Sequence, residues 1–256
     1  MDSNKTYDTV WREKLLDHMI SLGIPLQFIR WLRAFLSDRR ARVKLNNVFS
    51  NSCLFKQGLP QGSVLAPLFF LFYINDLAEH LPEDVLNSLF ADDVAILGTA
   101  RERNDATALV QHAVTIVERW SIIWKIKINV GKCEVAGFSA HTNDTHEDWS
   151  PVITLANKIL KDKPNPRLLG VILDRWMTFS AHINTIKDSL QQSFRQLQAV
   201  SHSDWGWSIT NLRAIFFSLI RTRLEYAGPA WLPNVSNENL KKLELTMYFT
   251  LLVTII

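Results

Sequence analysis

The chain has 256 residues, of which 47% are hydrophobic and 21% are charged, and its formal net charge is +3 at pH 7. This composition excludes a disordered or fibrous chain, and the length allows one large domain or two small ones without a disulfide or metal staple. The two cysteines, Cys53 and Cys133, lie far apart, which excludes a cysteine-rich zinc module and suits a reducing, intracellular compartment.

The first half of the chain alternates helical and hairpin patterns. Apolar residues recur at helical spacing in three places, and charged and apolar residues alternate about Asn46-Asn47, a pair that can turn. Two glycines and two prolines mark the segment after this alternation as a loop. The predicted elements are a helix from about Val10 to Gly23, a helix opened by Pro25, a hairpin over 40–56, a loop over 57–67 and a helix over 68–77.

The second half begins with strands and ends with helices. Short apolar runs flank Ala91-Asp92-Asp93 and predict a strand-turn-strand unit, after which an amphipathic stripe predicts a long helix. The predicted elements are strands over 88–90, 94–97, 133–138, 152–155 and 168–173, a helix over 109–124 and a helical pattern from about Phe179 onward. This order indicates an α+β domain over residues 1–174 followed by an all-α region over residues 175–256.

Positive charge is concentrated in two stretches. Residues 30–44 contain six Lys or Arg against Asp38 alone, and residues 157–200 contain seven against three Asp. A local basic excess beside a near-neutral total is typical of a groove that follows phosphates. A solvated charged surface would give the same pattern, so both interpretations stay open from charge alone.

The pair Asp92-Asp93 is the sharpest chemical feature. The apolar run on each side predicts a tight reversal with both carboxylates at its tip. Adjacent carboxylates repel each other unless a cation neutralises them, which favours a hard divalent ion such as Mg²⁺. An ordinary Asp-rich surface turn is the alternative.

Two further segments carry weaker signals. Residues 57–63 read QGLPQGS, where two glycines allow close backbone approach, but the segment matches neither a P-loop nor a dinucleotide fingerprint, and a structural turn stays open. Asp2 and Asp8 are two carboxylates six positions apart ahead of the first helix, although Asp2 alone is consistent with an ordinary terminal residue.

Taken in order, these segments resemble a known family. D-x-x-K-x-Y-D, QGLPQGSVLAPLFF and FADD resemble motifs A, B and C of reverse transcriptases, in the form found in non-LTR, LINE-type retrotransposons. Residues 120–139 resemble motif D, residues 167–174 resemble the primer-grip element, and residues 203–233 are similar to the helical segment that follows the polymerase in such elements. The resemblance implies a right-hand polymerase palm, with an antiparallel sheet packed on helices and partial fingers elements, followed by a thumb-like helical region.

The resemblance implies a metal-dependent catalytic centre. Asp2, Asp92 and Asp93 would be the catalytic carboxylates and would bind two Mg²⁺ ions, with Mn²⁺ as a substitute. Such ions lower the pKa of a primer 3′-hydroxyl and stabilise charge during in-line phosphoryl transfer. Leu169 and Gly170 would belong to the primer grip.

The resemblance also implies residues around the incoming nucleotide. Tyr7 stands where the family has a bulky gate that clashes with a ribose 2′-hydroxyl and so favours deoxynucleotides. Gln61 and the backbone of Gly62 would contact the nucleotide. Lys132 matches a motif D lysine that donates a proton to pyrophosphate, although a plain surface charge stays equally open at this position.

The partners that the resemblance implies are an RNA template, a DNA primer and deoxynucleoside triphosphates. No membrane partner is expected, because no signal sequence is visible and the apolar residues 249–256 are too few to span a bilayer. An intracellular location is expected, with action in the nucleus if integration is primed on chromosomal DNA. The oligomeric state and the identity of the copied RNA stay open.

The sequence departs from a complete polymerase at both ends. Only Met1 precedes Asp2, so the strand that would carry Asp2 has no residues on its N-terminal side, and the basic fingers residues that grip the triphosphate are not among these 256 residues. Residues 247–256 are apolar and β-branched, unlike the family, and indicate a truncated or frame-shifted end. We therefore expect a chain that binds an RNA–DNA duplex but extends a primer poorly.

Two alternatives follow from the same motifs. The first is a non-catalytic remnant that keeps a basic nucleic-acid-binding surface without productive metal geometry. The second is a related right-hand polymerase of the group II intron or telomerase type, which the QGSVLAP loop and the helical tail make the weaker interpretation.

Overall fold

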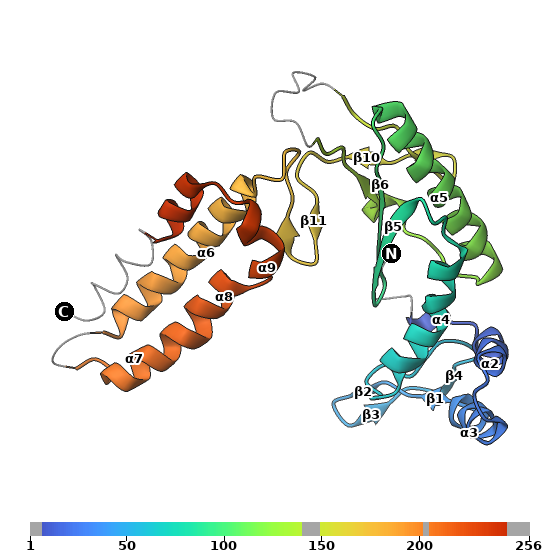
Figure 1. Ribbon diagram of the computed structural model, residues 1–256. Coiled ribbons are helices and arrows are strands. Elements are labelled where there is room, and N and C mark those ends of the chain that lie inside the picture. The colour runs from blue at the N-terminus through green and yellow to red at the C-terminus, as the bar shows by residue number, and fades with distance from the viewer. Residues whose placement is uncertain (1–6, 140–148, 202–204, 245–256) are drawn as a thin grey trace. The chain divides into compact units, whose positions relative to one another are not determined.

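A computed structural model describes residues 7–139, 149–201 and 205–244. The chain divides into two compact units, the first formed by Met1–Glu134 and Pro151–Lys161 and the second by Val135–Ser150 and Asp162–Ile256 (Figure 1). Strand β12 (Val171–Ile172) packs on helix α6 (Ser180–Ala199) within the second unit, which also contains Asp174. The boundary between palm and thumb-like region expected at Asp174 stays a prediction. The described helices and strands make the chain a mixed α and β protein, as expected.

The helices of the first unit confirm the helical spacing of the sequence. Pro25 stands at the N-cap of the second helix, and its fixed φ suits the entry to that helix. The fourth helix begins six residues before the predicted Leu109, because its first turn, RNDAT, is polar and carries no apolar stripe. The helices are α2 (Arg12–Ser21), α3 (Leu26–Leu36), α4 (Ala66–His80) and α5 (Arg103–Ile123).

The predicted hairpin over 40–56 forms two successive short ladders. Asn46 and Asn47 make the turn, both with positive φ (46° and 67°), which is the backbone of a type I′ hairpin turn. All strand residues of this hairpin are exposed. The paired strands are β1 (Arg40–Ala41) with β4 (Cys53–Leu54), and β2 (Lys44–Leu45) with β3 (Val48–Phe49).

A longer hairpin lies on helices α4 and α5. Strand β5 (Val85–Phe90) pairs antiparallel with β6 (Asp93–Gly98), and β5 contacts both helices while β6 contacts α5. A Cβ on Gly98 would approach the Ala106 carbonyl oxygen to 3.0 Å, so the absence of a side chain lets β6 lie close against α5. Within the described residues every sheet has two strands. Of the antiparallel palm sheet that the sequence predicts, the described residues therefore contain this hairpin.

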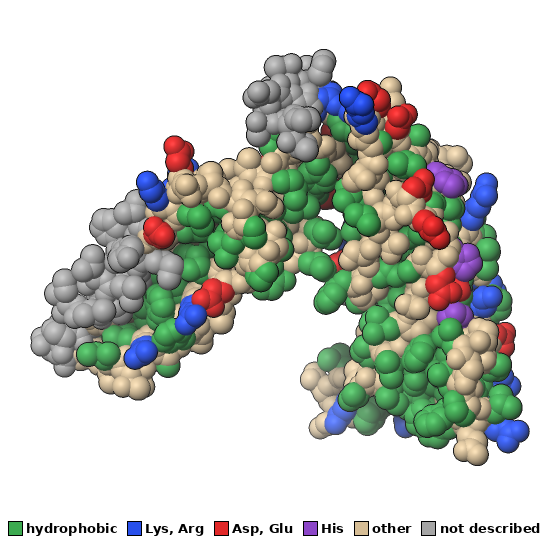
Figure 2. Space-filling view, viewed as in Figure 1, with side chains coloured by type: hydrophobic (Ala, Val, Ile, Leu, Met, Phe, Trp, Pro, Cys, Tyr) green, Lys and Arg blue, Asp and Glu red, His purple; other side chains and the backbone are tan. Residues whose placement is uncertain are grey.

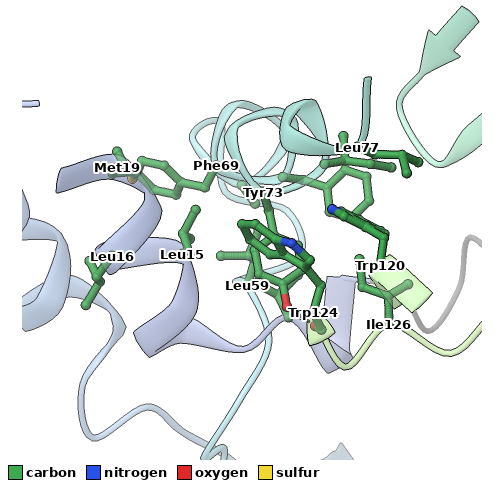
Figure 3. Packing of buried hydrophobic residues seen from close by; sticks show 14 of the residues in the cluster. Leu15, Leu16, Met19, Leu59, Phe69, Tyr73, Leu77, Trp120, Trp124 and Ile126 are labelled. Atoms are coloured by element: carbon green, nitrogen blue, oxygen red, sulfur yellow. Dashed lines mark hydrogen bonds between the residues drawn. The ribbon is translucent and has the colours of Figure 1, made fainter. Parts of the chain in front are cut away.

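The core of the first unit is built around aromatic side chains from α4 and the end of α5 (Figure 3). Tyr73 is fully buried and meets Trp124 edge to face, with ring centroids 4.8 Å apart. Its hydroxyl donates to the Trp124 carbonyl oxygen and accepts from the Trp11 backbone N–H at 3.2 Å. Burial raises the pKa of Tyr73 to about 12. Trp120 stacks on Trp124, so both tryptophans belong to the core.

Two of the later strand predictions need correction. The strand expected over 168–173 is a hairpin of β11 (Arg167–Leu168) and β12, because Leu169 and Gly170 both have positive φ (45° and 87°) and reverse the chain. The strand expected over 133–138 is only β7 (Glu134–Val135), which pairs with β10 (Lys161–Asp162). It follows a 3-10 turn, η1 (Val130–Lys132), and ends before Gly137, on which the Trp149 ring packs.

The strand expected over 152–155 is found as β8 (Thr154–Leu155), which pairs with β9 (Lys158–Ile159). The side chain of Gln111 on α5 holds this hairpin by accepting from the Thr154 N–H at 2.7 Å and donating to the Thr154 carbonyl at 3.0 Å.

The second unit is helical after β12, as the sequence predicts. Its core contains Phe179, Leu190, Ile220 and Trp231. In the described ranges, no helix is both long and apolar enough to cross a membrane. The helical elements are α6, α7 (Ile209–Ile215), a π-helical turn η2 (Phe216–Arg221), α8 (Thr222–Glu225), α9 (Gly228–Trp231), η3 (Leu232–Asn234) and a helical segment over 237–244.

Candidate active site

The Asp92-Asp93 pair lies at the tip of the β5–β6 hairpin, as the sequence predicts. Ala91 and Asp92 form the turn, and Asp93 is the first residue of β6, opposite Phe90. The turn therefore has two residues rather than the expected three. Asp92 is half-buried and Asp93 is exposed, so a solvated cation can approach the tip that carries both residues.

Tyr7 is held beside this tip. Its ring stacks on Phe70 of α4, with centroids 4.7 Å apart and an interplanar angle of 27°. Burial raises the pKa of Tyr7, and the negative charge of Asp92 raises it further. Asp92 thus acts electrostatically on Tyr7, the residue that the sequence predicts as the nucleotide gate.

The loop over 57–63 lies against the segment that contains Tyr7. The Leu59 N–H donates to the Tyr7 carbonyl at 2.7 Å, and the Gly58 N–H donates to the Val10 carbonyl at 2.9 Å. A Cβ on Gly58 would lie 2.5 Å from the Asp8 carbonyl oxygen, so this close backbone approach requires glycine. The loop predicted over residues 57–63 therefore packs its backbone against the motif A segment, so motifs A and B are in contact.

Gln61 of this loop has a side-chain partner that sequence reasoning did not assign. Its Nε2 donates to Asp8 Oδ1 at 3.0 Å. The neighbouring Gly62 has a φ of 83°, a conformation suited to glycine, with open space around the position of a Cβ. The backbone of Gly62 is accordingly accessible to a ligand.

Arg12 is a second residue that sequence reasoning missed. From the first turn of α2 its guanidinium donates to four backbone carbonyls, those of Leu36 (2.7 Å), Gly58 (2.8 Å), Phe55 (2.9 Å) and Gln57 (2.9 Å). Burial lowers the pKa of Arg12, and the positive charge of Arg39 lowers it further. No sequence signal could identify these contacts, because backbone carbonyls carry no residue type.

The remaining predicted site residues are placed as follows. Lys132 closes the η1 turn, whose N-cap Asn129 accepts from the Gly131 N–H at 3.2 Å. Leu169 and Gly170 form the turn between β11 and β12 in the second unit, where the Tyr226 hydroxyl donates to the Leu169 carbonyl at 2.8 Å. Asp2 lies outside the described residues.

The donor set at the hairpin tip suits a hard divalent ion, because two carboxylates supply oxygen ligands. Among the residues that the structure describes, no group of three or more His, Cys, Asp or Glu side chains could hold a metal ion. Asp92 and Asp93 are the described part of the predicted trio, and its third member is Asp2.

An open pocket of about 560 Å³ lies elsewhere in the first unit, between α2, α4 and α5. Asp76 stands in it, accepting from Trp120 Nε1 at 3.0 Å, with His80 Nδ1 at 3.5 Å and His18 Nδ1 at 3.9 Å. None of the predicted site residues lines this pocket. The Asp76 contacts therefore join α4 to α5 and to α2.

Comparison with known proteins agrees with the motif geometry. A family model described as reverse transcriptase (RNA-dependent DNA polymerase) matches residues 1–173. The chain is 31% identical over 201 residues to the RNA-directed DNA polymerase from mobile element jockey of Drosophila melanogaster, a match covering 76% of this chain and 21% of the relative.

Two further relatives come from the same organism. The probable RNA-directed DNA polymerase from transposon BS is 28% identical over 241 residues, covering 91% of this chain and 25% of the relative. The probable RNA-directed DNA polymerase from transposon X-element is 27% identical over 235 residues, covering 90% of this chain and 25% of the relative. The chain spans about a quarter or less of the length of these relatives. Since the matched residues contain all three motif segments, the chain belongs to the LINE-type branch of the reverse transcriptase family.

Proposed function

We propose that this chain is the catalytic part of an RNA-directed DNA polymerase of a non-LTR retrotransposon, acting on an RNA template, a DNA primer and deoxynucleoside triphosphates. The observation that supports it best is the Asp92-Asp93 tip, with Tyr7 held in electrostatic range of Asp92. In this proposal residues 1–174 supply the palm with partial fingers elements, and residues 175–256 supply a thumb-like region.

Asp2, Asp92 and Asp93 would hold the two Mg²⁺ ions. Bound there, the ions would lower the pKa of the primer 3′-hydroxyl and stabilise the charge that develops on the transferred phosphoryl group. The chain's own contribution at the tip is placement, because β5 and β6 pack on α4 and α5 and hold both carboxylates at one turn.

Tyr7 would act as the gate against ribonucleotides. The stack on Phe70 and the hydrogen bond from the Leu59 N–H restrain both its ring and its backbone. A restrained ring can discriminate by a steric clash, because it cannot move aside without losing these contacts.

Gln61 and Gly62 would contact the incoming nucleotide, with Gln61 oriented by its hydrogen bond to Asp8. Lys132 would donate a proton to pyrophosphate, and the Leu169–Gly170 turn would contact the primer. The hydrogen bond from Tyr226 to the Leu169 carbonyl supports a defined geometry for this turn.

A second function, nucleic-acid binding without catalysis, is favoured by the hairpin over 40–56. Arg42 and Lys44 lie over the ring of the exposed Phe49, at 5.5 Å and 5.6 Å from its centroid. Cations beside an exposed aromatic ring suit phosphates and stacked bases, and they require no metal.

Primer extension and binding together separate the two functions. The purified 256-residue chain is mixed with an RNA template, a DNA primer, Mg²⁺ and deoxynucleotides, beside the Asp92→Asn/Asp93→Asn variant and an Asp84→Asn control. We expect extension by the unsubstituted chain and the control, and a loss of at least ~10³-fold in the double variant.

Binding is measured on the same samples by fluorescence anisotropy at low and high salt. Affinity should be equal in all three proteins and should fall steeply with salt, as counterion release requires. Equal extension by the unsubstituted chain and the double variant would exclude the catalytic proposal. Affinity that does not change with salt would exclude both functions.

A further inference from the structure

Arg12 connects three segments that are distant in sequence. Its guanidinium donates to the last residue of α3 (Leu36), to the end of the 40–56 hairpin (Phe55), and to the first two residues of the motif B loop (Gln57 and Gly58). A guanidinium has five N–H donors in one plane. Arg12 makes four hydrogen bonds with them, all to backbone carbonyls. Arg12 therefore joins the start of the motif B loop to α3 and to the end of the hairpin.

The loop continues from these contacts to the nucleotide position. The amides of Gly58 and Leu59 bind the carbonyls of Val10 and Tyr7, so the loop is held between Arg12 and the Tyr7 segment. The Leu59 side chain is 2% exposed and lies in the aromatic core (Figure 3). Two residues further on, Gln61 meets Asp8. A continuous series of hydrogen bonds and buried contacts thus runs from Arg12 to Gln61.

The chemistry of this path requires arginine. Four carbonyl dipoles converge on one side chain, and only a cation with a planar fork of donors can satisfy them together. A lysine would keep the charge but has only three donors on a compact head, so it would leave at least one carbonyl without this partner.

We propose that Arg12 is a positioning residue for the incoming nucleotide: through the backbone of Gln57 and Gly58 it holds Gln61 where the nucleotide meets it. This inference rests on the function proposed above for Gln61. It concerns a residue outside the motif positions that the resemblance assigns.

The first test measures the loop itself. In Arg12→Lys, hydrogen exchange at the Gly58 and Leu59 amides should accelerate at least tenfold, while the amides of α5 keep their rates and show that the unit is folded. Arg33→Lys is the matched control, because Arg33 lies on the neighbouring helix with an exposed side chain 3.8 Å from Glu13. Unchanged exchange at Gly58 and Leu59 in folded Arg12→Lys would overturn the proposal.

The second test measures the nucleotide. Arg12→Lys should raise KM for the deoxynucleotide at least tenfold and leave KM for the template–primer unchanged, a split that general destabilisation would not produce. Adding Arg12→Lys to Gln61→Ala should cause no further rise, because residues that act through one group are non-additive. Additive effects would show that Arg12 does not act through Gln61.

A third measurement does not depend on catalytic turnover. Affinity for dTTP is measured at equilibrium on the chain with template–primer, by displacement of a fluorescent deoxynucleotide. The function proposed above fails if the unsubstituted chain neither extends a primer nor binds dTTP. The Arg12 proposal fails separately, if exchange is unchanged, if the effects add, or if dTTP affinity is equal in Arg12→Lys and the unsubstituted chain.

Discussion

Two hairpins of the first unit share a two-residue turn but are held in different ways. β2 and β3 turn at Asn46 and Asn47, and asparagine adopts a positive φ more readily than most residues. β5 and β6 turn at Ala91 and Asp92, where Ala91 has a φ of 51°. Alanine rarely adopts this conformation, so the turn residues favour the first hairpin and oppose the second.

Packing favours the two hairpins in the opposite order. The strands of the 40–56 hairpin are exposed, and hydrophobic side chains reach the surface there (Figure 2), whereas β5 and β6 lie on α4 and α5 (Figure 1). A left-handed alanine costs about 1–3 kcal/mol, which contacts elsewhere must offset. The tip that presents Asp92 and Asp93 is thus supported by packing on α4 and α5, while the turn of the basic hairpin is favoured by its own residues.

The largest effect on stability is expected at high pH, where Tyr73 in the core of the first unit ionises. Tyr73 has its pKa raised from 10.0 to about 12, so its contribution to stability is complete below pH 10 and is lost as the pH rises through 12. The free energy of unfolding should fall by about 2–3 kcal/mol across this range. Urea unfolding followed by tryptophan fluorescence measures it.

Tyr73→Phe is the control for that measurement. It keeps the ring but removes the ionisable hydroxyl, so its unfolding curve should lose this part of the pH dependence. Parallel pH profiles for the two proteins would mean that Tyr73 does not link the core to alkaline unfolding.

The next effect is expected beside the supported tip. Tyr7→Ala should admit ribonucleotides about 10–100-fold better relative to deoxynucleotides, because a clash of about 1–3 kcal/mol is removed. Tyr7→Phe keeps the ring that stacks on Phe70 and should leave discrimination unchanged. Competition between the two nucleotide types in primer extension measures the ratio, and equal ratios in the two variants would rule out a steric gate.

A smaller effect is expected at the exposed hairpin. Replacing Arg40, Arg42 and Lys44 by alanine should weaken binding to an RNA–DNA duplex about tenfold or more and lower the salt slope by about 3. Stability should change by less than about 0.5 kcal/mol, because these side chains lie on exposed strands or beside them. Anisotropy titrations at several salt concentrations measure the slope.

The matched control removes three exposed positive charges elsewhere in the same unit, those of Arg101, Arg119 and Lys127. If binding weakens equally in this control, net charge rather than the hairpin surface governs affinity.

The smallest effect compares the two turns directly. Ala91→Gly should raise the free energy of unfolding by up to about 1 kcal/mol, because glycine accepts a positive φ without the alanine penalty. Asn47→Gly should change it less, since asparagine already suits its conformation. Thermal unfolding of both variants tests this, and a loss of stability in Ala91→Gly would contradict the account of a strained tip.

The elements that sequence reasoning placed well are those with a local cause. Pro25 marks the start of α3, Asn46-Asn47 marks a turn, and the apolar runs about Asp92-Asp93 mark a hairpin. The sequence predicts one strand where β11 and β12 form a hairpin, because the apolar run continues through Leu169 and leucine gives no sign of a positive φ.

The sequence alone determined three features, because motif spacing and apolar periodicity are local properties. They are membership of the reverse transcriptase family, the hairpin that carries Asp92 and Asp93, and the helical character of the second unit. Only the tertiary structure decided that Asp8 orients Gln61 across 53 positions and that Arg12 binds carbonyls 24 to 46 positions away. The physical reason is that a backbone carbonyl is the same group at every residue. Its partner is chosen by the folded path of the chain and not by the residue that bears it.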